Sequence, residues 1–208
     1  MITLKNLSIG YNQQVVLTLQ HLELQNKNHY LLCGDSGCGK TTLLHTICGF
    51  IKPLSGEIII DNTNICKLSE GQMDSFRGQN IGIIFQNLHL IKSLNIVDNL
   101  LLGCYFTGRN NNTELAMEIL HSLKIDHLAK KFPYQISQGQ AQRLAIARAV
   151  LLKPKLILAD EPTANLDDKN CQIVIDLLKE TATQNQSTLV ISTHDQRLKN
   201  SFSEIINL

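Results

Sequence analysis

One glycine-rich segment carries the residue types and the spacing that bind phosphate. Its residues fit the pattern GxxxxGK[ST] and are Gly34, Asp35, Ser36, Gly37, Cys38, Gly39, Lys40 and Thr41. The glycines let successive backbone N–H groups turn toward phosphate oxygens, and the N-terminus of the following helix adds partial positive charge. Lys40 can then neutralise the β and γ phosphates, Thr41 can coordinate Mg²⁺, and Thr42 can donate a further hydrogen bond. The segment predicts a nucleotide-binding site.

Two adjacent carboxylates follow an apolar stretch at residues 156–159. Strand geometry is expected to point the side chains of Asp160 and Glu161 in opposite directions. Asp160 can then hold Mg²⁺ through water, and Glu161 can face the γ-phosphate and polarise an attacking water. General-base help of this kind contributes roughly 10²–10⁴-fold to a rate. The alternative is an ordinary acidic pair at a strand end before the turn residue Pro162, and the phosphate loop favours the functional interpretation.

A histidine ends another apolar stretch. His194 follows residues 188–193, which predict a strand that finishes at the same sheet edge as Asp160. A histidine at this place can hydrogen-bond the γ-phosphate and sense its presence. The other histidines occur singly in helical, strand or loop patterns, and we interpret them as structural or surface residues: His21, His29, His45, His89, His121 and His127.

The elements that must position these groups alternate between short β-like stretches and helical patterns. This alternation predicts an α/β fold with a mainly parallel core sheet flanked by helices. Residues 29–33, 81–85 and 155–159 are continuous apolar stretches, which predicts central strands buried on both faces, with residues 187–192 as a fourth. Residues 2–9, 15–24 and 56–60 predict an N-terminal antiparallel portion, and residues 40–48 predict a helix after the phosphate loop.

The pattern changes to helices between residues 86 and 150. Ala116, Ile119, Leu120 and Leu123 fall on one helix face, and residues 139–152 continue at helical spacing. We therefore expect a single domain over residues 1–208. Its core would comprise residues 1–85 and 155–208, and residues 86–154 would form an inserted helical subdomain with a hinge near residues 86–93.

Composition excludes several classes of protein. The 208 residues are 43% hydrophobic and 18% charged, enough to bury a full core. A formal net charge of +1 provides no global positive field, so we expect no nucleic-acid partner. The apolar stretches are far shorter than the roughly 20 residues of a membrane-spanning helix, and the first residues do not read as a secretory signal. We expect a cytoplasmic protein whose six scattered cysteines are small buried residues in a reducing compartment.

Several motifs together resemble the ABC ATPase family over essentially the whole chain, within the P-loop NTPase fold. The discriminating segment is Ile136-Ser137-Gln138-Gly139-Gln140, which is similar to the family signature LSGGQ and leads into an arginine- and alanine-rich helix over residues 142–149. The resemblance implies that this segment closes over the γ-phosphate of ATP held by a second copy. Ser137 and the backbone of Gly139 would then supply donors to the anion from a helix N-terminus.

The same resemblance assigns further residues. It implies that Gln86 is the glutamine that touches Mg²⁺ and water, that Asp160 and Glu161 form the Walker B pair, and that His194 is the switch histidine. Residues 165–167, Asn-Leu-Asp, match the D-loop of the family. Tyr11 matches the aromatic residue that stacks on adenine, although a lone tyrosine at a strand end is normally a packing residue.

Gln138 departs from the family, which usually has the first of two glycines there. A side chain could crowd the approach of the backbone to phosphate, or the position could demand a φ that favours glycine. Residues 81–101 and 162–167 are similar to the subgroup that serves lipoprotein release and macrolide efflux. We therefore expect an ATP-dependent pair on the inner face of the membrane that drives a separate permease subunit, with no further regulatory domain after Leu208.

Two alternatives remain open. One is a soluble ABC ATPase of a cytoplasmic assembly machine, which co-purification after detergent extraction distinguishes from a transporter subunit. The other is a nucleotide-gated binding module with little catalysis, which the Gln138 departure motivates and steady-state ATPase measurements test.

Overall fold

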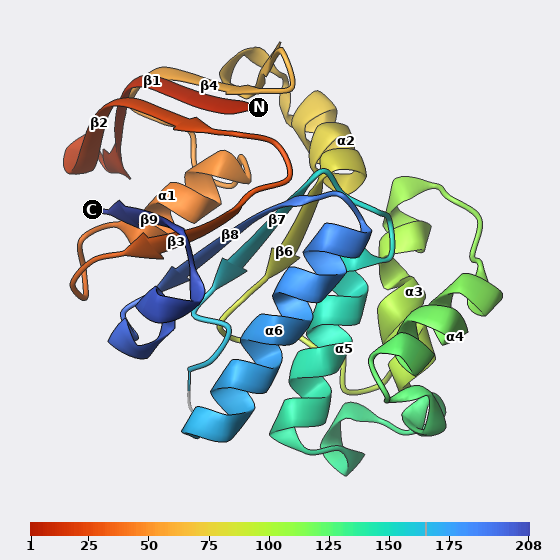
Figure 1. Ribbon diagram of the computed structural model, residues 1–208. Helices are drawn as coiled ribbons and strands as arrows, with labels where there is room; N and C mark the ends of the chain where they lie inside the picture. The colour runs from red at the N-terminus through yellow and green to blue at the C-terminus, as the bar shows by residue number, and fades with distance from the viewer. Residues whose placement is uncertain (165) are drawn as a thin grey trace.

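Two sheets and the helices around them form the structure, a computed structural model that describes residues 1–164 and 166–208. The antiparallel sheet has the order β2-β1-β4-β5 and contains β1 (Ile2–Tyr11), β2 (Gln14–Leu24), β4 (Ser55–Ile60) and β5 (Thr63–Asn64). The parallel sheet has the order β6-β7-β8-β3-β9 and contains β3 (His29–Cys33), β6 (Ile81–Ile84), β7 (Leu156–Asp160), β8 (Thr188–Thr193) and β9 (Glu204–Asn207). This arrangement confirms the expected fold class (Figure 1).

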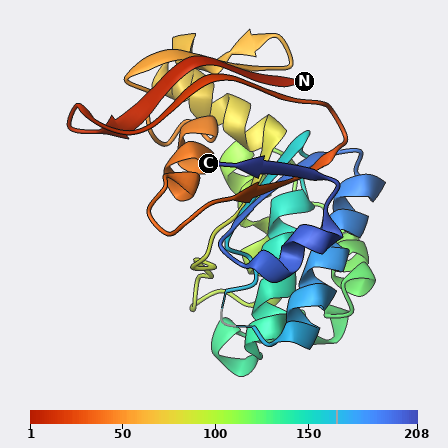
Figure 2. The same ribbon diagram turned by 60° about the vertical axis from the view of Figure 1, so that its left-hand side comes forward.

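The helices lie between and around these sheets. They are α1 (Lys40–Ile47), α2 (Glu70–Asn80), α3 (Ile96–Thr107), α4 (Thr113–Ser122), α5 (Gln138–Val150) and α6 (Asp168–Gln184), with short 3₁₀ turns η1 (Ile65–Lys67), η2 (Asp126–Leu128), η3 (Pro133–Gln135) and η4 (Gln196–Ser201). Figure 2 shows the antiparallel sheet and α1 on one side of the parallel sheet, and α5 and α6 on the other. None of the helices in the described part of the chain is long and apolar enough to cross a membrane.

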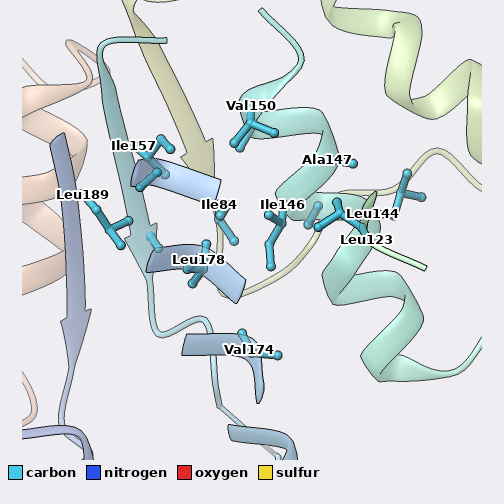
Figure 3. Close-up of a cluster of buried hydrophobic side chains, with 14 of the residues drawn as sticks. Ile84, Leu123, Leu144, Ile146, Ala147, Val150, Ile157, Val174, Leu178 and Leu189 are labelled. Atoms are coloured by element: carbon cyan, nitrogen blue, oxygen red, sulfur yellow. The ribbon is translucent and has the colours of Figure 1, made fainter. Parts of the chain in front are cut away.

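The central strands are buried on both faces, as the continuous apolar stretches predict. In β3, Leu31 and Cys33 belong to the core shared with the helices, whereas Tyr30 and Leu32 face α1 and the antiparallel sheet. Successive strand residues point to opposite faces, so one strand contributes side chains to the hydrophobic clusters on both faces of the parallel sheet. Figure 3 shows strand residues Ile84, Ile157 and Leu189 packed with side chains of α5 and α6.

Helices α3, α4 and α5 occupy the segment that we expected to form an inserted subdomain. Leu100 of α3, Leu120 of α4 and Ile146 of α5 are fully buried in the same cluster as Ile157 of β7. The helical segment therefore packs on one face of the core sheet, which fixes the position of α5 relative to the strands. The division into residues 1–85 with 155–208 and residues 86–154 stays a prediction.

Helix α2 is an element that the sequence analysis missed. Met73 is the only buried residue of this helix, so the helix presents no apolar stripe that periodicity could detect. The start of α2 does carry a sequence signal, a serine followed three residues later by a glutamine. In the structure the Ser69 hydroxyl accepts a hydrogen bond from the Gln72 N–H, and the Gln72 side chain accepts one from the Ser69 N–H. This capping box marks a helix start in the sequence itself.

The cysteines were only partly predicted. Cys33, Cys48, Cys104 and Cys171 are buried free thiols, as expected, but Cys66 is exposed and Cys38 is half-buried in the phosphate loop. Burial raises the pKa of the Cys33 thiol, opposed by the positive charges of Lys199 and Lys40, so this thiol at the end of β3 stays protonated at neutral pH.

Gly82 allows α5 to approach β6 closely, and we predict that Gly82→Ala destabilises the fold. A Cβ at this position would lie 2.2 Å from the Ala149 carbonyl oxygen and 2.9 Å from Cγ of Pro154. Overpacking of this kind costs about 1–3 kcal/mol. Urea unfolding should show this loss, whereas the control Gly103→Ala in α3, whose Cβ would contact Leu152 Cδ1 at an ordinary 3.8 Å, should not. Equal stability of the two variants would contradict the prediction.

Candidate active site

The phosphate loop joins the carboxyl end of β3 to α1. Gly39 has φ 101° and Gly37 has φ 84°, both in the left-handed region that favours glycine. Gly39 caps α1, and a Cβ there would lie 3.2 Å from side-chain atoms of Val16 and Leu17 in β2. The loop conformation therefore favours glycine at both positions, of which the sequence pattern specifies Gly39.

Lys40 is the first residue of α1 and folds back into the loop. It is 7% exposed, and its Nζ donates hydrogen bonds to the carbonyl oxygens of Gly34 at 2.7 Å and Asp35 at 2.9 Å. Cys38 Sγ lies 3.8 Å from the same nitrogen. These contacts are with neutral groups, so the charge of the ammonium group remains to attract a phosphate inside the loop.

Asp160, at the end of β7, is anchored between two hydroxyl groups. Its Oδ1 accepts hydrogen bonds from Thr41 Oγ1 at 3.1 Å and from Ser192 Oγ of β8. Asp160 is 7% exposed, and Ser192 is fully buried. The carboxylate is thereby oriented toward the first turn of α1, next to the residue that the sequence motif assigns to the metal.

Glu161 does not continue the strand, which corrects the expectation of two alternating strand side chains. Strand β7 ends at Asp160, and Glu161 has φ 46°, a conformation that is uncommon for a residue with a Cβ. Its N–H donates to the Ser192 carbonyl oxygen at 3.0 Å, which holds this turn against β8. Local backbone strain of this kind gathers at functional sites.

The Glu161 side chain joins His194 across the sheet edge. Glu161 Oε1 lies 2.8 Å from His194 Nδ1 and accepts from the His194 N–H at 3.0 Å, while Oε2 accepts from Thr193 Oγ1 at 3.1 Å. A carboxylate only accepts, so this contact assigns a proton to Nδ1 and leaves Nε2 for another partner. The Glu161 side chain is 12% exposed and that of His194 is 67% exposed, so the histidine can reach a ligand.

One pocket brings half of the predicted residues together at the carboxyl ends of β3, β6, β7 and β8. The predicted residues among its lining are Ser36, Gly37, Gly39, Lys40, Thr41, Thr42, Gln86, Glu161 and His194. Gln86 follows β6 and is exposed, so the turn after that strand carries it to the pocket. Val16 of β2 also lines the pocket and was not predicted. The sequence indicated only that Val16 lies in a strand of the antiparallel portion, and nothing in the sequence connected that strand with the phosphate loop.

The signature segment forms the N-terminus of α5 and does not line this pocket within the described residues. Ser137 caps the helix, because its Oγ accepts from the Gln140 N–H at 3.3 Å while Gln140 Oε1 accepts from the Ser137 N–H at 2.9 Å. Gln138 is the first helical residue, is exposed, and is not among the described residues with positive φ. Glycine is therefore not needed for the backbone at this position.

Comparison with known proteins identifies the family. Residues 16–164 match the ABC transporter family. The chain belongs to this family. A lipoprotein-releasing system ATP-binding protein LolD from Pseudoalteromonas translucida is 36% identical over 201 residues, which are 96% of this chain and 87% of the relative. LolD from Treponema pallidum is 40% identical over 169 residues, which are 80% of this chain and 75% of the relative.

A solved structure supports the same conclusion. The dimeric ATP-binding cassette MJ0796, in a post-hydrolysis state with ADP and Pi, is 33% identical with a TM-score of 0.89, and the match covers 100% of this chain and 94% of that chain. The resemblance to ABC ATPases, including the lipoprotein-release subgroup, is thus confirmed. The chain is an ABC transporter ATP-binding subunit and an ATPase.

Six other predicted residues do not line the phosphate-loop pocket in the described part of the chain: Tyr11, Gly34, Asp35, Cys38, Asp160 and Asp167. Tyr11 is the last residue of β1, is 51% exposed, and pairs with Gln14 across the β1–β2 hairpin. Asp167 caps α6, where its Oδ1 accepts from the Asn170 N–H at 2.9 Å. Asn165 of the predicted D-loop lies outside the described residues. The roles of Tyr11 and Asp167 in ligand binding stay predictions.

The donor set fits Mg²⁺, which is usual in the ABC family. Mg²⁺ commonly binds one or two carboxylates together with substrate phosphates and water. Asp160 supplies one oriented carboxylate, and Thr41 supplies a hydroxyl 3.1 Å from it at the pocket wall. Among the described residues, no group of three or more His, Cys, Asp or Glu side chains could hold a metal by itself.

Proposed function

We propose that two copies of the chain bind two ATP molecules between them and hydrolyse them to move a separate membrane permease. The observation that carries this proposal is the division of the site. The pocket collects the phosphate loop, Gln86, Glu161 and His194, whereas Ser137, Gly139 and Gln140 lie elsewhere on the chain. A second copy would present its α5 N-terminus to the open side of the pocket. Each triphosphate is then fully contacted only when both copies are present.

The hydrolytic step uses the groups on the β7 and β8 edge. The Glu161 carboxylate accepts the proton of a water molecule whose oxygen attacks the γ-phosphorus, while the bond from that phosphorus to the β–γ bridging oxygen breaks and ADP leaves. The Nδ1–H of His194 holds the carboxylate at 2.8 Å, and when both ring nitrogens carry a proton Nε2 donates to a γ-phosphate oxygen. Lys40 and the loop N–H groups stabilise negative charge on the transferred group.

Asp160, Thr41 and Gln86 are the residues that would hold Mg²⁺. When bound, the ion neutralises charge on the β and γ phosphates. The chain contributes the orientation of Asp160, which the hydroxyls of Thr41 and Ser192 fix before any ligand arrives. Preorganised ligands of this kind require little rearrangement on binding.

The permease would dock beside the Gln86 turn. Phe106, near the end of α3, is 76% exposed and lines a groove with Phe85, the residue directly before Gln86, and with Arg148 of α5. Arg148 donates hydrogen bonds to the carbonyl oxygens of Leu88 and His89. This side chain therefore connects the groove with the backbone directly after Gln86. Movement of a segment seated there would reach the pocket through Gln86.

The LolD relatives support lipoprotein release as the process that this transporter serves, and with it export from the membrane rather than import. The chain would then work in the cytoplasm, held on the inner face of the membrane by its permease.

Co-purification tests the transporter proposal against a soluble assembly machine. We expect detergent extraction to recover a multi-spanning membrane protein with the chain. Phe106→Asp should lower that recovery by more than about tenfold, because the aromatic side chain contributes about 1.5–3 kcal/mol when buried and the carboxylate opposes burial. The matched control is Met117→Asp on α4, another exposed apolar residue outside the groove. Recovery with soluble proteins only would contradict the proposal.

A further inference from the structure

Two aromatic rings are stacked at the surface directly before the signature helix. The rings of Phe132 and Tyr134 have centroids 5.6 Å apart and an interplanar angle of 11°. Tyr134 is 71% exposed although it belongs to the short turn η3. Large exposed aromatic faces are typical of binding surfaces. The hydrolytic mechanism uses neither ring.

The backbone that carries this stacked pair is held in place by hydrogen bonds. The Phe132 N–H donates to Gln135 Oε1 at 2.9 Å, which closes the η3 turn. The preceding residues are tied to the start of α3, where the Ile96 N–H donates to the Lys131 carbonyl oxygen at 2.8 Å. A ring platform that is already ordered loses little conformational entropy when a ligand binds.

The position of the pair suits a ligand with an anionic end and a flat aromatic end. Tyr134 precedes Ser137, the cap of α5, by three residues, which span at most about 11 Å. The α5 N-terminus favours anions. Lys130 and Lys131 are exposed beside the pair and have no ion-pair partner among the described side chains, which adds positive charge on the same side. A nucleoside triphosphate has both of these features.

We propose that Phe132 and Tyr134 form a stacking platform for the second face of the adenine ring of the ATP that the other copy holds in its phosphate loop, the first face being the one that the family resemblance assigns to Tyr11 of that copy. This inference rests on the proposed two-copy function. Among the described residues, neither ring lines the chain's own phosphate-loop pocket, so the base belongs to a nucleotide held by the second copy. The platform adds affinity to the ATP-bound pair. Stacking discriminates only weakly between adenine and other bases, because every base has a π face.

The test uses Glu161→Gln as the parent protein, because slow hydrolysis keeps ATP intact during the measurement. Tyr134→Ala in this parent should raise the dissociation constant of the ATP-bound dimer by about tenfold or more, measured by sedimentation. ATP binding by the separate monomer should stay unchanged. Tyr134→Phe should restore dimerisation, since it keeps the ring. The matched control is Tyr105→Ala, a tyrosine that is 75% exposed on α3.

The outcomes separate the platform from the two-copy function. A parent that stays monomeric with ATP overturns both. A parent that dimerises while Tyr134→Ala dimerises equally well overturns the platform alone. The platform is also overturned by a Tyr134→Phe variant as weak as Tyr134→Ala, or by an equal loss in the Tyr105→Ala control. Thermal unfolding of each variant verifies that the fold is intact.

Discussion

Glu161→Gln is expected to lower kcat for ATP hydrolysis by about 10²–10⁴-fold, the contribution typical of a positioned general base. The amide oxygen can replace Oε1 and accept from the His194 N–H, and the amide NH2 can donate to the Thr193 hydroxyl oxygen, so the fold of the β7 and β8 edge is preserved. The amide cannot take the proton of the attacking water. ATP affinity should therefore change little while turnover is lost.

A coupled assay of ADP or phosphate release measures this effect. Glu118→Gln on α4 is the matched control, since Glu118 is exposed and outside the pocket, and its kcat should equal that of the unaltered chain. A Glu161→Gln kcat within about threefold of that control would show that another group activates the water.

Lys40→Met is expected to weaken ATP binding by about 30-fold to 5 × 10³-fold. The side chain is buried and its ammonium group lies inside the phosphate loop, where removing one partner of a close charge pair costs about 2–5 kcal/mol. Methionine keeps the unbranched shape, so the loss reports the charge rather than a cavity.

Calorimetric titration with ATP, or displacement of a fluorescent nucleotide, measures the change in Kd. Lys5→Met provides the control, because Lys5 is an exposed residue of β1 outside the pocket lining. If Lys40→Met bound ATP as tightly as Lys5→Met, the phosphate loop would not be the principal phosphate site.

The core of the fold was predictable because its strands are apolar on both faces. The stretches at residues 29–33, 81–85 and 155–159 correspond to β3, β6 and β7 within one residue at each end. Helix α2 was missed because it buries little and contains Gly71 and Gly78. Strands β5 and β9 were not expected either. The two-residue β5 is too short to show a period, and β9 has mostly exposed side chains.

The residues of the pocket were predictable from motifs, but their geometry was not. Sequence spacing placed Lys40, Asp160 and His194 at one sheet edge, and the parallel order of β3, β7 and β8 brings them there. The left-handed backbone of Glu161 depends on its contact with the Ser192 carbonyl oxygen, 31 residues later in the chain. The helical φ of Gln138 likewise depends on where α5 begins, which the signature pattern did not specify.

The central claim is that two copies complete each ATP site, and the mass of the Glu161→Gln protein in solution tests it most directly. Light scattering should report a single chain without nucleotide and twice that mass with ATP and Mg²⁺. The Lys40→Met, Glu161→Gln double variant should stay a single chain in both conditions. A Glu161→Gln protein that binds ATP yet keeps the mass of one chain would contradict the account.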